Sequence, residues 1–260
     1  MPPPPVTAES AAPILRLRGV GRRFGGVQAV RDVTLDVSGR ERRAILGPNG
    51  AGKTTLFNLI SGEIPPTEGA IELFGTDVTR LPARARPKLG LSRTFQTSRV
   101  LGGLSVVDNI YLAILGADEG HYRPIRTARD EEIRERARAV ASETGLGEAT
   151  DHIADELSHG EQRQLEVAMA RATNPRLMML DEPAAGLSRS ERQQLTEMLL
   201  GLDREITLIL IEHDMDVALR VAESVTMMHD GNVIVEGTPD EIRANETVHE
   251  LYLGSQYAHV

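Results

Sequence analysis

The nine residues "GPNGAGKTT" at positions 47–55 decide the fold of this chain. They match the phosphate-loop pattern G-x-x-x-x-G-K-[ST], with a short apolar strand pattern before them and after them a helical pattern that Gly62 should end. In such a loop, glycines let backbone N–H groups surround phosphate oxygens, and the start of the helix adds a partial positive charge. Lys53 would reach the outer phosphates, and the Thr54 hydroxyl would face Mg²⁺.

The use of lysine in the chain supports this interpretation. Only two of the 29 basic residues are lysines, Lys53 and Lys88, and one of them occupies the position that the motif requires. A glycine-rich turn that binds nothing is the alternative, and this coincidence disfavours it.

Two later segments extend the pattern into a sheet. Residues 176–183 ("RLMMLDEP") and 206–214 ("ITLILIEHD") are continuous apolar runs, typical of parallel strands buried on both faces. Near the start, residues 15–18 ("LRLR") alternate, which predicts an antiparallel strand with one exposed face. We therefore predict an α/β fold: a P-loop NTPase core with a parallel sheet flanked by helices, an N-terminal antiparallel β subdomain and an inserted α-helical subdomain.

The helical insertion is predicted at roughly 97–172. Its character is charged and amphipathic, as in Thr127–Glu143, where Ile133, Ala137 and Val140 share one face. We expect residues 1–12 ("MPPPPVTAESAA") to be a disordered tail, residues 13–255 to form one domain, and 256–260 to be a short tail.

Composition excludes several classes of function. Without cysteine, the chain can form neither a disulfide framework nor a thiolate metal site. A net charge of −9 has the wrong sign for coating nucleic acid or an anionic membrane face. No apolar run approaches the roughly 20 residues of a membrane span, and no signal peptide is evident, so we expect a cytoplasmic protein.

The ends of the two apolar runs carry candidate catalytic groups. Asp181 and Glu182 follow the first run and His213 follows the second, where open α/β sheets bind ligands. Asp181 would hold Mg²⁺ through water, while Glu182, on the other side of the strand, would polarise the attacking water. His213 could bond the γ-phosphate. Taken singly, each has an alternative, a solvated turn or a structural histidine, but the phosphate loop favours the catalytic interpretation.

A second anion site is suggested by "LSHGEQRQL" at 157–165. Ser158 and Glu161 have the spacing of a capping box, and a helix start binds anions. The sequence therefore poses the question of why one chain should carry two anion sites.

Over nearly all of residues 13–255 the chain resembles the nucleotide-binding subunit of an ABC transporter. "GPNGAGKTT" resembles its Walker A motif, "LMMLDE" its Walker B motif with the catalytic glutamate, and His213 its switch histidine. "RTFQ" places Gln96 at the position of the glutamine that touches Mg²⁺ and senses the membrane partner. "LSHGEQ" resembles the LSGGQ signature, which contacts the γ-phosphate held by the other subunit of a head-to-tail dimer. This would explain the two anion sites.

The resemblance implies ATP and Mg²⁺ as cofactors and a set of site residues. Phe24 would stack on adenine, unless it merely packs in the core. Ser188 stands where many relatives have Asp, which puts a carboxylate contact across the dimer in doubt. The implied catalytic residues are Glu182, His213 and Gln96, and the implied metal-binding residues are Thr54, Gln96 and Asp181. The implied nucleotide-binding residues are Phe24, Gly47, Pro48, Asn49, Gly50, Ala51, Gly52, Lys53, Thr54, Thr55, Ser158 and Gly160.

Within the family, "DEPAAGL", "EHDMDV", "RTFQ" and "LYLG" most resemble importers of branched-chain amino acids. The implied partners are a second, same or related, ATPase subunit, transmembrane permeases and, indirectly, a periplasmic or extracellular substrate-binding protein, with no nucleic acid. The subunit would then lie on the cytoplasmic face of the inner membrane, attached through the permeases. Two alternatives are the ATPase of a lipopolysaccharide-type exporter and a soluble ABC ATPase without a transport role.

Overall fold

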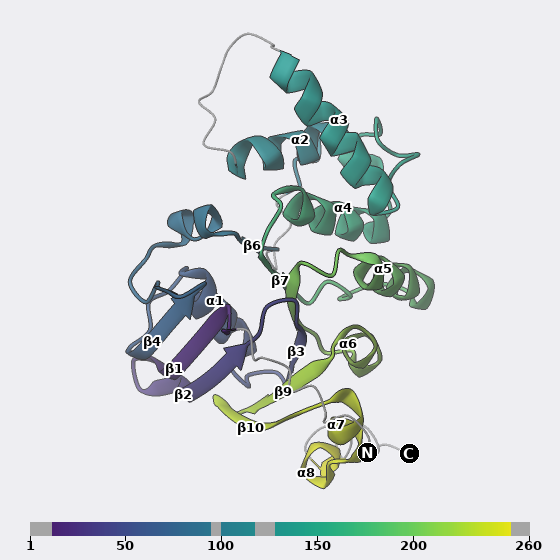
Figure 1. The fold of residues 1–260 in the computed structure, drawn as a ribbon. Helices are drawn as coiled ribbons and strands as arrows, with labels where there is room; N and C mark the ends of the chain where they lie inside the picture. Colours follow the sequence, from purple (N-terminus) through teal and green to yellow (C-terminus); the bar gives the residue numbers. More distant parts are fainter. Residues whose placement is uncertain (1–11, 95–99, 118–127, 251–260) are drawn as a thin grey trace, which may run out of the picture.

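The structure is a computed structural model and describes residues 12–94, 100–117 and 128–250. Figure 1 shows an antiparallel sheet beside a central, mostly parallel sheet, with a group of three helices at one end of the molecule. This is the predicted α/β architecture with its antiparallel and helical additions.

The central sheet has six strands in the order β10-β9-β3-β8-β7-β6. Five of them run parallel, and β10 pairs antiparallel with β9. Every residue of β7 and β8 is buried, as the continuous apolar runs predicted. The strand bounds are β3 (Arg42–Leu46), β6 (Leu91–Arg93), β7 (Leu177–Asp181), β8 (Thr207–Ile211), β9 (Ser224–His229) and β10 (Asn232–Gly237).

The antiparallel sheet has four strands in the order β2-β1-β4-β5. Its inner face, which includes Leu15 and Leu17, packs with α1 and one face of the central sheet into a common hydrophobic core. The alternation of residues 15–18 therefore marked a half-buried strand correctly. The bounds are β1 (Leu15–Phe24), β2 (Val27–Val37), β4 (Glu68–Leu73), β5 (Thr76–Asp77) and α1 (Lys53–Ser61).

Helix α1 ends at Gly62, as predicted, and a buried arginine closes that end. Gly62 has φ 80°, and a Cβ there would lie 2.5 Å from Nε of Arg86. The Arg86 guanidinium donates to the carbonyl oxygens of Leu59, Ile60 and Val78, and burial lowers its pKa to about 10. The last carbonyls of α1 therefore have a cationic donor from the segment that contains η1 (Ala83–Ala85) and η2 (Pro87–Leu89).

Three helices form a separate cluster, with its own buried core, between β6 and β7 in the chain. They are α2 (Val106–Ala117), α3 (Ala128–Glu143) and α4 (His159–Ala172), with η3 (Ala154–Glu156) preceding α4. The predicted inner face of α3 is buried at Ile133, Ala137 and Val140. Thr127 and residue 97 lie outside the described residues, so the bounds 97–172 stay a prediction.

The second face of the central sheet is covered by α5 (Arg189–Gly201) and α6 (Met215–Val221), and the C-terminal part adds α7 (Pro239–Ala244) and α8 (Glu246–Val248). In the ranges that the structure describes, no helix combines the length and the apolar character needed to cross a membrane.

Candidate functional site

The loop from β3 to α1 is pressed against neighbouring backbone, which explains its glycines. Gly52, the residue before α1, has φ 98°, and a Cβ there would lie 2.4 Å from the carbonyl oxygen of Ala29. A Cβ on Gly47 would lie 2.3 Å from the carbonyl oxygen of Met228. Only glycine fits at these two positions, because a side chain would overlap the neighbouring backbone. The backbone of the loop can therefore lie close to the start of α1, where N–H groups favour an anion.

The rest of the loop is partly open to solvent. Asn49 and Gly50 are exposed, Thr54 and Thr55 are half-buried, and the Ala51 N–H donates to the Pro48 carbonyl at 3.1 Å.

Lys53 lies across this loop. Its Nζ donates to the carbonyl oxygens of Gly47 at 2.7 Å and Pro48 at 3.1 Å, and the residue is 5% exposed. Burial lowers the pKa of Lys53, while the nearby charges of Glu182 and Asp181 oppose that change. An ammonium group is thus held between the loop and two carboxylates, where it could neutralise a polyphosphate.

Asp181, the last residue of β7, is buried against an arginine. Nη2 of Arg93 donates to its Oδ2 at 3.1 Å, and Asp181 is 3% exposed. Burial raises the pKa of Asp181, and Arg93 opposes the rise. Its other oxygen, Oδ1, is buried and has no hydrogen-bond partner among the described residues. An unpartnered carboxylate oxygen fits a water-bound Mg²⁺, which takes one or two carboxylates together with phosphate oxygens.

Glu182 and His213 are in direct contact. Oε1 of Glu182 lies 2.6 Å from Nε2 of His213. Strand β7 ends at Asp181, and Glu182 has φ 50° while its N–H donates to the Ile211 carbonyl at 2.9 Å. Glu182 therefore leaves the strand in a left-handed conformation, which strand alternation did not predict.

A second buried carboxylate holds the two loops that carry this pair. Glu212 accepts hydrogen bonds from the backbone N–H groups of Ala184 at 2.7 Å and His213 at 3.1 Å. Glu212 is 2% exposed, and burial raises its pKa to about 7. A cavity of about 230 Å³ adjoins these groups and is lined by Glu182, Glu212 and His213, among others.

The signature-like segment starts α4 with the predicted capping box. The Glu161 N–H donates to Oγ of Ser158 at 3.3 Å, and the Ser158 N–H donates to Oε2 of Glu161 at 2.8 Å. The Gly160 N–H donates to Oε1 of Glu191 at 3.0 Å. Among the residues that the structure describes, Ser158 and Gly160 form no hydrogen bond with the phosphate loop of their own chain.

Ser188 caps the next helix, α5, together with Glu191. The Ser188 N–H donates to Oε2 of Glu191 at 2.8 Å, and the Ser188 hydroxyl to the same oxygen at 2.6 Å. One carboxylate therefore connects the starts of α4 and α5. Position 188 lacks the Asp that the family resemblance led us to expect, but the carboxylate of Glu191 stands three residues later at the same helix start.

Phe24 lies at the end of β1 and is 45% exposed, so the alternative of core packing is wrong. The guanidinium of Arg22 lies 4.6 Å from its ring centre, and an exposed ring at a strand end could stack on a base. Gln96 lies outside the described residues, so its predicted roles stay a prediction.

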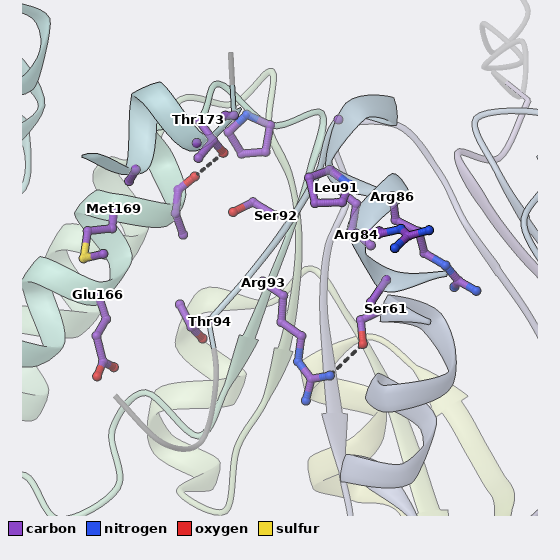
Figure 2. Close-up of a pocket in the computed structure, with 18 of the residues that line it drawn as sticks. Ser61, Arg84, Arg86, Leu91, Ser92, Arg93, Thr94, Glu166, Met169 and Thr173 are labelled. Atoms are coloured by element: carbon purple, nitrogen blue, oxygen red, sulfur yellow. Dashed lines mark hydrogen bonds between the residues drawn. The ribbon is translucent and has the colours of Figure 1, made fainter. Parts of the chain in front are cut away.

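A larger cavity, about 500 Å³, lies between the core and the helical cluster. Figure 2 shows residues from β6 and the end of α1 facing residues of α4 across it. The labelled lining residues are Ser61, Arg84, Arg86, Leu91, Ser92, Arg93, Thr94, Glu166, Met169 and Thr173.

Three charged residues of this site were not predicted from the sequence: Arg93, Glu191 and Glu212. Arg93 is the charged end of the three-residue strand "LSR", and Glu191 completes the capping-box pattern that Ser188 begins. Glu212 directly precedes His213 at the end of an apolar run. A charged residue at the end of an apolar strand, or three residues after a helix cap, can be noticed in the sequence. The groups that these three residues bond across the fold, Asp181, Gly160 and Ala184, are far from them in the sequence.

Comparison with known proteins assigns the family. Residues 30–185 match the ABC transporter family model, and residues 232–258 match the model described as branched-chain amino acid ATP-binding cassette transporter. The chain is 37% identical over 250 residues to the high-affinity branched-chain amino acid transport ATP-binding protein LivG of Salmonella typhimurium, with 93% of this chain and 98% of that protein covered.

Two solved structures are similar over most of the chain. One is the ADP conformation of an ATP-binding cassette of an ABC transporter, with a TM-score of 0.81 and 28% identity over 93% of this chain and 99% of that one. The other is a dimeric post-hydrolysis state of a cassette bound to ADP and Pi, with a TM-score of 0.73 and 25% identity over 86% of this chain and 98% of that one. With its phosphate loop, strand-end carboxylates and matching family model, the chain belongs to the ABC transporter family, as one of its ATP-binding proteins.

Proposed function

We propose that the chain binds ATP with Mg²⁺ at the phosphate loop, hydrolyses it, and powers an importer for branched-chain or other hydrophobic amino acids. One observation carries the proposal. Lys53, the Asp181–Glu182 pair and His213 follow β3, β7 and β8, which are neighbours in one parallel sheet. Their carboxyl ends therefore meet at one edge, where α/β sheets bind ligands.

Each group at this edge has a proposed task. Lys53 would neutralise the outer phosphates, and the Thr54 hydroxyl and Asp181 would hold Mg²⁺. When bound, Mg²⁺ supplies positive charge to the phosphate oxygens during transfer. Glu182 would orient and polarise the attacking water, and its 2.6 Å contact with His213 would fix the direction of its carboxylate.

The second anion site calls for a second subunit. Ser158 and Gly160 begin a helix whose partial positive charge suits a phosphate, yet among the described residues they form no hydrogen bond with the phosphate loop of their own chain. We propose that two cassettes, the same or related, pair head to tail, with Ser158 of each contacting ATP held by Lys53 of the other. The similarity to a dimeric cassette supports this arrangement.

The permease would bind at the 500 Å³ cavity between core and helices. This cavity is lined by both parts of the molecule, so a segment seated in it could sense their relative position. The protein would thereby be held at the cytoplasmic face of the inner membrane, with a substrate-binding protein on the far side. The match of residues 232–258 to the branched-chain model favours an importer over a lipopolysaccharide-type exporter or a non-transport ATPase.

Dimerisation of two variants tests the proposal. Glu182→Gln keeps the shape of the side chain but removes its basic group, so ATP should bind and persist and the subunits should pair. Hydrolysis should fall by at least about 10²-fold, a barrier change of roughly 2.7 kcal/mol. Adding Ser158→Arg should abolish pairing in light scattering. Pairing without nucleotide in both variants, or near-normal turnover in Glu182→Gln, would contradict the proposal.

A transport assay is the second test of the proposal. Uptake of branched-chain amino acids in cells that express the permeases should require Glu182. If deletion of the gene leaves this uptake normal but stalls delivery of lipid to the cell surface, the exporter alternative is correct.

A further inference from the structure

Arg93 connects the phosphate-loop helix with Asp181. Its Nη1 donates to Oδ1 of Asn58 and to Oγ of Ser61, each at 2.7 Å, and both partners lie on α1. Its Nη2 donates to Oδ2 of Asp181 at 3.1 Å. The side chains of Arg93 and Asp181 are 7% and 0% exposed, so water competes little for this ion pair.

The two oxygens of Asp181 therefore have different environments. Arg93 occupies Oδ2, whereas Oδ1 is buried and has no partner among the described residues. A carboxylate held through one oxygen cannot rotate freely about its terminal torsion. The Oδ1 atom thus keeps one orientation relative to α1, the helix that begins with Lys53 and Thr54.

Arg93 also borders the 500 Å³ cavity. Figure 2 shows its side chain reaching from β6 toward Ser61 at the end of α1, and both residues line that cavity. The same residue therefore borders the cavity that we assign to the permease and bonds the carboxylate that we assign to Mg²⁺.

We propose that Arg93 is a positioning residue for the divalent cation: by fixing Oδ2 of Asp181 to α1, it leaves Oδ1 oriented for a water molecule of Mg²⁺. This inference rests on the proposed function, because it requires a nucleotide to bind with Mg²⁺ at the phosphate loop. The competing explanation is that the ion pair only stabilises the fold. If Arg93 positions Asp181, its removal lowers the part of the nucleotide affinity that depends on Mg²⁺. If the ion pair only stabilises the fold, its removal affects nucleotide binding equally with and without Mg²⁺.

The test measures the affinity for a non-hydrolysable ATP analogue, adenylyl imidodiphosphate, by calorimetry in Mg²⁺ and in EDTA. The ratio of the two affinities reports the contribution of the cation. Groups that hold a metal ligand in place commonly change metal affinity by 10- to 100-fold when removed. Arg93→Met should therefore reduce the ratio by about tenfold or more, while the affinity in EDTA changes by less than about twofold because Lys53 and the loop are intact.

Graded variants and a matched control accompany this measurement. Arg93→Lys and Ser61→Ala should reduce the ratio by smaller factors, because each keeps part of the connection between Asp181 and α1. They also keep the test decisive if Arg93→Met does not fold. Arg43→Met removes another arginine of the same sheet, which is bonded to the carboxylates of Glu41 and Glu236, and should leave the ratio unchanged.

Three outcomes separate the explanations. The inference would be overturned if the ratio of the affinities in Mg²⁺ and in EDTA equalled the wild-type ratio in all the Arg93 and Ser61 variants. Equal losses in Mg²⁺ and in EDTA would also overturn it and assign Arg93 a structural role. If the wild-type protein binds the analogue equally well in both solutions, or if Lys53→Ala leaves binding unchanged, the proposed function itself fails.

Discussion

Replacement of Glu212 by glutamine should make the protein's stability less dependent on pH. Glu212 is 2% exposed at the end of β8, and burial raises its pKa from 4.5 to about 7. A shift of one pKa unit corresponds to about 1.4 kcal/mol, so the ionised carboxyl costs the folded state about 3 kcal/mol relative to the unfolded chain.

The sign of the change in unfolding free energy with pH follows from proton binding. Between pH 4.5 and about 7 the folded chain holds a proton on Glu212 that the unfolded chain has released. The free energy of unfolding therefore falls as pH rises through this window, and it levels off above pH 7. Most of this change, about 2 to 3 kcal/mol, lies between pH 5 and pH 8. Glutamine does not titrate, so Glu212→Gln should lack this component.

The assay is urea unfolding at a series of pH values between 5 and 8. Far-UV circular dichroism is the suitable signal, because the chain has no tryptophan. The unfolding free energy of wild type minus that of Glu212→Gln should fall by about 2 to 3 kcal/mol over this range. The amide introduced at this position would meet the N–H group of His213, but this cost does not vary with pH and cancels from the slope.

Glu241→Gln is the matched control. Glu241 completes the capping box of Thr238 at α7, and hydrogen bonds from Thr238 lower its pKa. That carboxyl is mostly ionised in both states across this range, so its variant should differ from wild type by a nearly constant amount. A flat difference for Glu212→Gln as well would refute the reasoning, because it would mean that the carboxyl is not desolvated.

Three further variants test other parts of the structure. Lys53→Ala should weaken ATP binding severely, and an unchanged affinity in calorimetry would contradict the assignment of the phosphate loop. Arg86→Met removes the guanidinium that donates to the carbonyls of Leu59, Ile60 and Val78, although Leu59 and Val78 keep backbone donors from Gly62 and Leu81. The free energy of unfolding should fall by about 1 to 3 kcal/mol, mainly because the Ile60 carbonyl loses its donor; an unchanged urea midpoint would argue against this role of Arg86. Glu191→Ala, made in the Glu182→Gln protein, should reduce ATP-dependent pairing while the affinity of the separate subunit for ATP stays the same, because the Gly160 N–H loses its acceptor; equal pairing in gel filtration would count against this role.

Predictions based on neighbouring residues were accurate. The phosphate-loop pattern, the end of α1 at Gly62, the buried strands β7 and β8 and the Ser158 capping box all appear in the structure. These features depend on backbone conformation and burial within a few residues, which the local order of side chains encodes.

The contacts that organise the site depend on residues far apart in the chain. Arg93 and Asp181 are 88 residues apart, Gly160 and Glu191 are 31 apart, and Ala184 and Glu212 are 28 apart. Their meeting depends on β6, β7 and β8 being neighbours in the central sheet and on the packing of α4 beside α5. No local pattern encodes strand order, because the same apolar run pairs equally well with several neighbours.

The sequence by itself thus determined the chemistry of this protein: a phosphate loop with one lysine, two carboxylates and a histidine at strand ends, and a second helix start suited to an anion. Only the tertiary structure decided which groups share hydrogen bonds, that Glu182 faces His213 and that Arg93 fixes Asp181. The physical reason is the range of the interactions. Backbone propensity acts over a few residues, whereas a buried charge is stable only beside a partner that the complete fold brings to it.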